Sequence, residues 1–341
     1  MMSRSSRPAP ASTLPAATPA PGRRIARLLL AFICLEAASP AAPQSPAFQL
    51  RAGREPITPI PPAPAQDQRR VALGEQLFHD QRLSKNNARS CSTCHDTRTN
   101  GASANAHDLT PEGQPLELNT PTIFNAALSF RLNWEGNFRS LELEAENALR
   151  NPRLMASSAD EVVSKLRADP KQAQKFRDAY GRDPDVAALL DAIATYERSL
   201  VTPGSRFDRW LQGDDGAITQ EELSGYQLFK SLGCVTCHQG VNMGGNLFQR
   251  HGIFHPLGSP EPVLVRVPSL RNVATTPPYF HDGSAATLSK AIKAMGYVQL
   301  DRVLTDQQIA SIAAFLKTLT GVYRGEPVVP ATGRPNGEAP P

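Results

Sequence analysis

The sequence lacks long apolar runs, segments of alternating polar and apolar residues, and a charge excess beyond its first 42 residues. Each absence excludes a class of protein. The apolar run at 28–35 has eight residues, whereas a helix that spans a bilayer needs about 20. No segment alternates polar and apolar residues as the strand of a half-exposed sheet does, so the predicted fold class is all-α. Residues 1–42 hold five arginines and one glutamate, five minus one, which accounts for the whole net charge of +4. The rest is balanced, and nothing indicates a nucleic-acid partner.

The first 42 residues have the order of a secretory leader. Three arginines at 23–27 precede the apolar run at 28–35, and small residues follow through 37–42. A basic region, a short apolar core and a small-residue cleavage site are typical of signal peptides. We therefore expect the leader to be removed on export together with Cys34. The mature protein is then predicted to be periplasmic, without a membrane anchor.

Cysteine is scarce as well, and four of the five cysteines form two copies of one motif. Two thiols three positions apart can add to the vinyl groups of one porphyrin, and a histidine directly after them can bind its iron. A four-cysteine zinc site would also fit the cysteine spacing, but it would leave both histidines unexplained. The sequence thus predicts two covalently bound haem c groups, held by Cys91, Cys94 and His95 and by Cys234, Cys237 and His238.

A short repeat precedes both motifs. Gly74-Glu75-Gln76-Leu77-Phe78 matches Gly225-Tyr226-Gln227-Leu228-Phe229, and each copy has apolar residues at helical spacing. We predict two tandem cytochrome c-like domains, each binding one haem. The predicted parts are the leader 1–42, a linker 43–66, an N-terminal haem domain 67–202, a C-terminal haem domain 203–325 and a disordered tail 326–341. Further helices are predicted at 141–149, 160–168, 186–200 and 305–319.

The sixth position of each iron also needs a ligand or an opening. Methionine there favours electron transfer, whereas an open position permits chemistry with a small oxidant. Met243 is only five residues past His238, too near to reach the opposite haem face, whereas Met295 lies in a glycine-flanked turn far enough along the chain. His251, His255 and His281 are further candidates for the second haem. Around the first motif the other histidines are His79 and His107, and His107 lies in a polar loop from which it could bind the iron.

From about Leu73 to Gly321 the chain resembles the bacterial diheme cytochrome c peroxidases. The stretches that carry this resemblance keep their order and spacing; they are 73–78, 82–84, 91–95, 119–122, 134–136, 233–238, 244–249, 267–273, 278–283 and 295–296. The resemblance implies that the haem of His95 is the peroxidatic one and that the haem of His238 and Met295 is the electron entry point. The implied activity is reduction of hydrogen peroxide to water, with electrons from a small c-type cytochrome or a cupredoxin.

The resemblance implies further site residues. Trp134 matches a tryptophan between the haems. A calcium ion would be held by the side-chain amide of Asn119 and by the backbone carbonyls of Thr276 and Pro278. Oxygen ligands of this kind suit calcium. The family is often dimeric, which allows a homodimer here.

Two positions depart from the family pattern. Ten residues after Trp134, where the peroxidases have glutamine, this chain has Glu144; twenty after it, where they have a catalytic glutamate, it has Leu154. Leucine cannot move a peroxide proton, so Glu144 is the remaining candidate for the distal acid–base role. The alternative for Glu144 is a solvated helix face.

The departures keep two other functions open. In the related MauG-type diheme enzymes, which oxidise a partner protein, a tyrosine stands where this chain has Met295. A diheme electron carrier without peroxidase activity is the second alternative. It requires a firm sixth ligand on the first haem, for which His107 is the obvious supplier.

Overall fold

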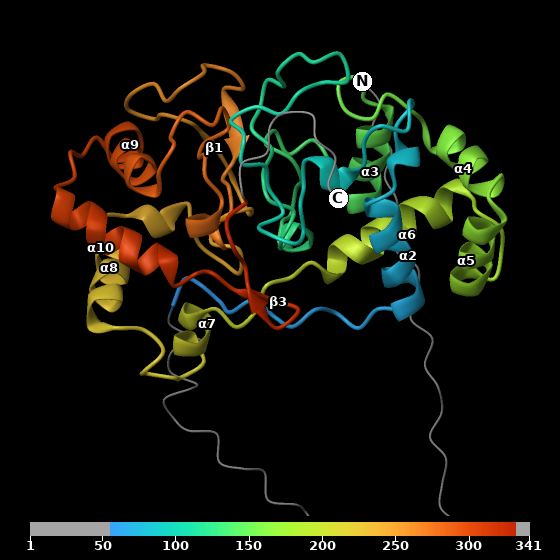
Figure 1. The fold of residues 1–341 in the computed structure, drawn as a ribbon. Helices are drawn as coiled ribbons and strands as arrows, with labels where there is room; N and C mark the ends of the chain where they lie inside the picture. The colour runs from blue at the N-terminus through green and yellow to red at the C-terminus, as the bar shows by residue number, and fades with distance from the viewer. Residues whose placement is uncertain (1–54, 332–341) are drawn as a thin grey trace, which may run out of the picture. The chain divides into compact units, whose positions relative to one another are not determined.

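The computed structural model describes residues 55–331, and the chain is mostly helical (Figure 1). The all-α prediction is confirmed. The predicted leader with Cys34, the first part of the predicted linker and residues 332–341 of the predicted tail lie outside the described residues. Between 55 and 331, every helix is too short or too polar to cross a membrane.

Five α-helices make up the first half of the described chain. Each begins at a serine or aspartate whose side chain accepts a backbone hydrogen bond from the first turn. They are α2 (Gln68–Phe78), α3 (Leu141–Arg150), α4 (Ala159–Arg167), α5 (Pro170–Tyr180) and α6 (Val186–Ser199). The predicted bounds of α3, α4 and α6 agree with the structure to within one residue. The sequence analysis missed α5, which buries little beyond Phe176 and two alanines.

Four α-helices make up the second half of the described chain. They are α7 (Arg206–Leu211), α8 (Gln220–Ser231), α9 (Leu288–Leu300) and α10 (Asp306–Lys317). Capping boxes begin α8 and α10, in which the cap hydroxyl and the side chain three residues later satisfy each other's backbone N–H groups. Short 3-10 helices lie in the loops; they are η1 (Gln81–Leu83), η2 (Cys91–Thr93), η3 (Ala126–Leu128), η4 (Cys234–Thr236) and η5 (Val273–Thr275).

The repeated glycine brings two helices close together in each half. α2 packs on α6, and α8 packs on α10 (Figure 1). A Cβ atom on Gly74 would lie 2.0 Å from the carbonyl oxygen of Ala192, and one on Gly225 would lie 2.0 Å from that of Ser311. Only glycine allows so close an approach. The repeat in the sequence is therefore a repeated helix crossing.

Two short antiparallel strand pairs lie within the described residues. β1 (Phe248–Arg250) pairs with β2 (Leu264–Arg266), Phe248 opposite Arg266. β3 (Val322–Tyr323) pairs with β4 (Glu326–Pro327). The sequence analysis predicted no strand, because two or three residues are too few for an alternating pattern to show.

Thr202 connects the two halves at the predicted domain boundary. It is fully buried, and its hydroxyl oxygen accepts hydrogen bonds from Nδ2 of Asn125 at 2.8 Å and Nδ2 of Asn272 at 3.0 Å. Both asparagines have left-handed backbone, and they begin η3 and η5 respectively. Equivalent residues of the two halves thus converge on one side chain. The division into domains at this point stays a prediction.

Two predicted boundaries need correction. Part of the predicted linker is packed: Ile57 is fully buried in the hydrophobic cluster of the second half, and Arg271 donates to the Thr58 carbonyl at 2.7 Å. The predicted disordered tail begins too early, because β4 is paired and Val328 is buried against the cluster that contains Phe78. Single apolar residues anchor both segments, and composition does not show this.

Candidate functional site

Both haem motifs fold in the same way. The cysteine pair of each begins a 3-10 turn, η2 in the first motif and η4 in the second. The backbone N–H of His95 donates to the carbonyl of Cys91, and that of His238 donates to the carbonyl of Cys234, both at 3.0 Å. Each turn therefore keeps its two thiols and its histidine on one short stretch of chain.

The two motif histidines are also held alike. Nδ1 of His95 lies 3.0 Å from the carbonyl oxygen of Gly101, and Nδ1 of His238 lies 3.1 Å from that of Met243. A carbonyl can only accept, so Nδ1 holds the proton and Nε2 is left free to bind a metal. Burial lowers the pKa of both imidazoles. Both rings are therefore neutral, as iron ligation requires.

A shared zinc site is not supported. Within residues 55–331, no three or more His, Cys, Asp or Glu side chains are grouped so that they could hold a metal ion.

Both motifs face one cavity of about 790 Å³. Its wall includes every residue predicted to hold a haem, namely Cys91, Cys94, His95, Cys234, Cys237, His238 and Met295. Apolar side chains make up most of the remaining wall, among them Leu141, Leu149, Ile292 and Leu316. A largely apolar cavity with a few polar groups suits a porphyrin.

Met295 lines the cavity, but the predicted turn around it is wrong. Ala294, Met295 and Gly296 lie inside α9, where Gly296 packs so closely on Leu304 that a Cβ would lie 2.7 Å from Leu304 Cγ. Met243 is fully buried in the core, and its carbonyl oxygen lies 3.1 Å from Nδ1 of His238.

The remaining histidine candidates divide into two groups. His251 and His281 line the cavity, with ring centroids 4.3 Å apart. His255 pairs with Asp301 at 2.7 Å and is not part of the cavity wall. His79 and His107 are not part of that wall either, and Nδ1 of His107 is buried without a hydrogen-bond partner among the described residues. The structure therefore does not bring His107 to the first motif.

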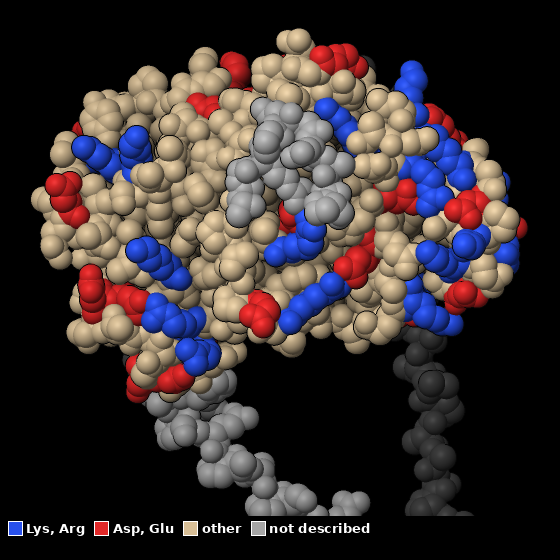
Figure 2. All heavy atoms as spheres, viewed as in Figure 1, with Lys and Arg blue, Asp and Glu red and all other residues tan. Residues whose placement is uncertain are grey.

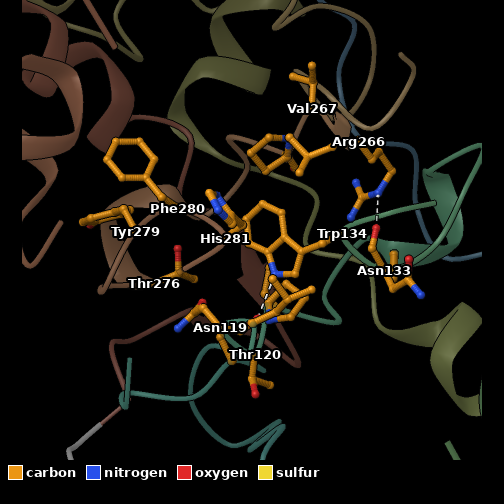
Figure 3. Close-up of a pocket in the computed structure, with 18 of the residues that line it drawn as sticks. Asn119, Thr120, Asn133, Trp134, Arg266, Val267, Thr276, Tyr279, Phe280 and His281 are labelled. Atoms are coloured by element: carbon orange, nitrogen blue, oxygen red, sulfur yellow. Dashed lines mark hydrogen bonds between the residues drawn. The ribbon is translucent and has the colours of Figure 1, made fainter. Parts of the chain in front are cut away.

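Trp134 is fixed by contacts with both halves (Figure 3). Its indole N–H donates to the carbonyl of Asn119 at 2.7 Å, and its own carbonyl accepts from the backbone N–H of Arg266 at 2.7 Å. The ring meets His281 edge to face, with centroids 6.4 Å apart. Trp134 is 8% exposed and lines the cavity. Contacts from both halves of the chain therefore fix the position of this side chain.

Two polar groups of the cavity wall lack a counterpart. Arg266 donates through Nε to the carbonyl of Asn133 at 3.0 Å, and among residues 55–331 its guanidinium has no carboxylate partner (Figure 3). Nε2 of His251 is buried and has no hydrogen-bond partner in the described chain. A half-buried cation without a carboxylate partner is costly. The propionate carboxylates of a haem are acceptors of the kind that both groups lack, so this donor set fits a haem.

The three predicted calcium ligands, Asn119, Thr276 and Pro278, also line this cavity, and the first two are labelled in Figure 3. Nδ2 of Asn119 donates to the carbonyls of Asn105 at 3.0 Å and Ala106 at 3.2 Å. This fixes the amide and leaves Oδ1 to accept or to ligate. A calcium ion at this place stays a prediction.

Two carboxylates line the cavity near the first motif. Glu144 of α3 lines it together with Leu154, so the solvated-face explanation for Glu144 is not supported. Glu197 of α6, which the sequence analysis missed, is 7% exposed and lines it too. A signal was present: Glu197 lies four residues after Ile193, on the apolar stripe of its helix. Burial raises the pKa of the Cys91 thiol, and the charges of Glu197 and Glu144 raise it further.

Comparisons with known proteins cover both halves. Residues 68–216 match the family model of the di-haem cytochrome c peroxidases, and residues 223–320 match that of cytochrome c. A cytochrome c551 peroxidase of Nitrosomonas europaea is 38% identical, over 79% of this chain and 85% of the relative. The methylamine utilization protein MauG of Methylorubrum extorquens is 30% identical, over 80% of this chain and 84% of the relative. The crystal structure of a MauG-like protein associated with microbial copper homeostasis matches with a TM-score of 0.68 at 27% identity, covering 77% of this chain and 93% of that chain.

Proposed function

The chain belongs to the di-haem cytochrome c peroxidase family, and we propose that it is a periplasmic enzyme that reduces hydrogen peroxide to water with electrons from a small c-type cytochrome or a cupredoxin. One observation carries the proposal: a single cavity has two unlike ends. The end near Cys91 contains Glu144, a candidate proton carrier, whereas the wall also contains Met295, a candidate ligand for an electron-transfer haem.

When bound, the two haem c groups supply the one-electron transfers and the reduction of peroxide. The chain's own part is to hold and orient them. The four motif cysteines provide the thioether bonds, and His95 and His238 present a neutral Nε2. Arg266 and His251 offer hydrogen bonds to propionates.

The electron donor is proposed to dock beside α9, the helix that contains Met295. Exposed apolar side chains lie there: Val303 is 83% exposed, and Phe254 is 58% exposed and is linked to α9 by a backbone hydrogen bond to Val298 at 2.9 Å. Figure 2 shows that much of the surface over β1, the strand that leads towards Phe254, is uncharged. An apolar patch of this kind suits a transient protein contact.

Trp134 is the proposed connection between the two haems. It is packed against His281 from the second half and bonded to Asn119 from the first. Its rigid placement fits a group through which electrons pass. A calcium ion ligated by Asn119, Thr276 and Pro278 would stiffen the same region, and a homodimer is part of the proposal by family resemblance.

Glu144 is the proposed acid–base group. Burial raises its pKa to about 7, so near neutral pH its carboxylate can accept a proton from one peroxide oxygen and return it to the other as the O–O bond breaks. Leu154 lines the same cavity and can only exclude water.

A MauG-like role, oxidation of a partner protein, is the second candidate. It is favoured by the 30% identity to a MauG protein, and Met295 in place of tyrosine argues against it. An electron carrier without peroxidase activity is disfavoured, because His107 does not line the cavity.

Stopped-flow oxidation of a reduced small c-type cytochrome or cupredoxin by the purified diheme protein tests the proposal. Donor oxidation that depends on peroxide, with two donor molecules oxidised per peroxide consumed, is expected. Peroxide-independent electron exchange with the donor would instead indicate a carrier.

A further inference from the structure

Glu197 has no role in the proposed reaction, yet burying its carboxylate costs free energy. It lies in the last turn of α6, is 7% exposed and lines the cavity together with Glu144. Among residues 55–331, no protein group donates a hydrogen bond to either carboxylate. A buried carboxylate without a donor is destabilising when ionised. One that is retained in a cavity wall is therefore a candidate functional group.

The two carboxylates line one cavity and lie on helices that pack against each other. α3, which contains Glu144, packs on α6, which contains Glu197. The residues beside them on the two helices, Glu142 and Arg198, form an ion pair. Arg198 is thus paired with Glu142, and its charge lowers the pKa of Glu197 by less than burial and the two neighbouring carboxylates raise it.

Charged groups on the other elements around α6 are also engaged elsewhere. On α2, Arg70 pairs with Asp191 at 3.4 Å, and on α4, Lys165 pairs with Glu161 at 3.1 Å. η3 has no titratable side chain. The groups that act on Glu197 are therefore Glu144, Glu142 and Arg198.

Protonation follows from this arrangement. Burial raises the pKa of Glu144 to about 7 and that of Glu197 well above its ordinary value, and an ionised Glu144 raises the latter further. Glu197 is buried whereas Glu144 is only half-buried, so Glu144 ionises first and Glu197 keeps its proton. Because the two groups interact, the two steps belong to the pair.

We propose that Glu144 and Glu197 form a carboxylate–carboxylic acid pair that holds one proton beside the first haem, with Glu197 as the residue that positions Glu144 and resupplies it. This rests on the proposed function. Reduction of one peroxide takes up two electrons, which come from the donor protein, and two protons, and it yields two waters. Glu144 moves one proton from one peroxide oxygen to the other. The proton of Glu197 is one of the two consumed, and solvent replaces it.

Infrared difference spectroscopy of the diheme protein during a pH titration tests the pair without any turnover. In the wild type, the C=O band of a protonated carboxylic acid persists above pH 7, and it is absent in E197Q. In E144Q the band of Glu197 disappears at lower pH than in the wild type, because the neighbouring charge has been removed. Glu146→Gln is the matched control on α3: Glu146 pairs with Arg150 at 2.7 Å, and its replacement leaves the titration unchanged.

The pH profile of peroxide reduction supplies the second readout. In the wild type, the rate of peroxide reduction is expected to follow a bell-shaped curve against pH. It should rise as Glu144 ionises near pH 7 and fall when Glu197 loses its proton. The E197Q variant is expected to keep the acid limb, because its amide resembles the protonated acid beside Glu144. It should lose the alkaline limb, and its rate should be lower by about 10-fold.

Three results would overturn the pair. One is a Glu197 band whose titration is the same in E144Q and in the wild type. Another is an unaltered pH profile in E197Q, which would make Glu197 a structural residue. A third is loss of the infrared band already at the pH of an ordinary glutamate. If E197Q does not take up haem, the infrared titration of the Glu197 band in E144Q tests the pair by itself. A wild type that does not reduce peroxide would refute the proposed function and leave the infrared test intact.

Discussion

The first and second haem motifs have the same scaffold and different surroundings. In both halves a 3-10 turn holds the cysteine pair, a backbone carbonyl binds Nδ1 of the histidine, and a helical glycine lets two helices cross closely. The cavity wall near the first motif contains Glu144 and Glu197, and Met295 comes from the second half. The repeated scaffold therefore fits cofactor binding, and the unrepeated wall differentiates the two sites.

Replacing the two proximal histidines one at a time should have the largest effect, because it separates peroxide reduction at the first haem from electron uptake at the second. His95→Ala is expected to reduce peroxide turnover on the order of 1,000-fold, because the peroxidatic iron loses its ligand, while the second haem still accepts electrons from the donor. His238→Ala is the matched variant. It should abolish donor oxidation and leave peroxide binding at the first haem. Equal loss of both properties in both variants would contradict a division of labour.

Glu144→Gln removes the proposed acid–base group from one half alone. Peroxide turnover should fall by roughly 100-fold. In the wild type the rate should decline as the pH is lowered through about 7, because a protonated Glu144 cannot accept the peroxide proton. This acid limb should be absent in the variant. The measurement is the rate against pH at saturating donor.

The control for that experiment is Glu146→Gln, a change of the same kind on the same helix. It should leave both the rate and the acid limb in place. A Glu144→Gln enzyme with the wild-type profile would show that another group moves the proton.

Met295→His should change the second half alone. Histidine favours ferric iron more than methionine does, so the potential of the second haem is expected to fall by about 0.1 V or more. Potentiometric titration followed by optical spectra measures this. The first haem should keep its potential and its response to peroxide. An unchanged second potential would show that Met295 is not the ligand.

Thr202→Val tests the point where equivalent residues of the halves meet. It leaves Nδ2 of Asn125 and of Asn272 buried without this acceptor, at a cost of about 1–3 kcal/mol per unsatisfied group and roughly 2–6 kcal/mol in all. Urea unfolding followed by circular dichroism measures the loss. The control is Thr320→Val, a half-buried threonine whose hydroxyl makes no hydrogen bond within residues 55–331. Equal stability of the two variants would contradict the role given to Thr202.

How much the sequence can predict depends on how local each signal is. The motif residues from Cys91 to His95 are contiguous, so their roles are evident from the sequence alone. α6 is predictable from its apolar periodicity. The same periodicity places Glu197 on the apolar face of the helix, which indicates that its side chain is buried. The segment around Met295 resembles a turn in the sequence because glycine usually breaks helices, whereas Gly296 serves a close contact with Leu304 inside one.

Other features depend on tertiary contacts that no local pattern contains. Ile57 and Val328 are isolated apolar residues in stretches of turn-like composition, and they are buried by elements far away in the sequence. The partnerless guanidinium of Arg266 becomes visible only when its surroundings are known.

The central claim is that the first haem is open to peroxide while the second is a six-coordinate relay. Electron paramagnetic resonance of the oxidised and the half-reduced protein, with and without peroxide, tests it directly. We expect a high-spin ferric signal from the first haem that is lost on adding peroxide, beside a low-spin signal from the second that does not respond. Two low-spin haems that ignore peroxide in both redox states would contradict the account and leave an electron carrier.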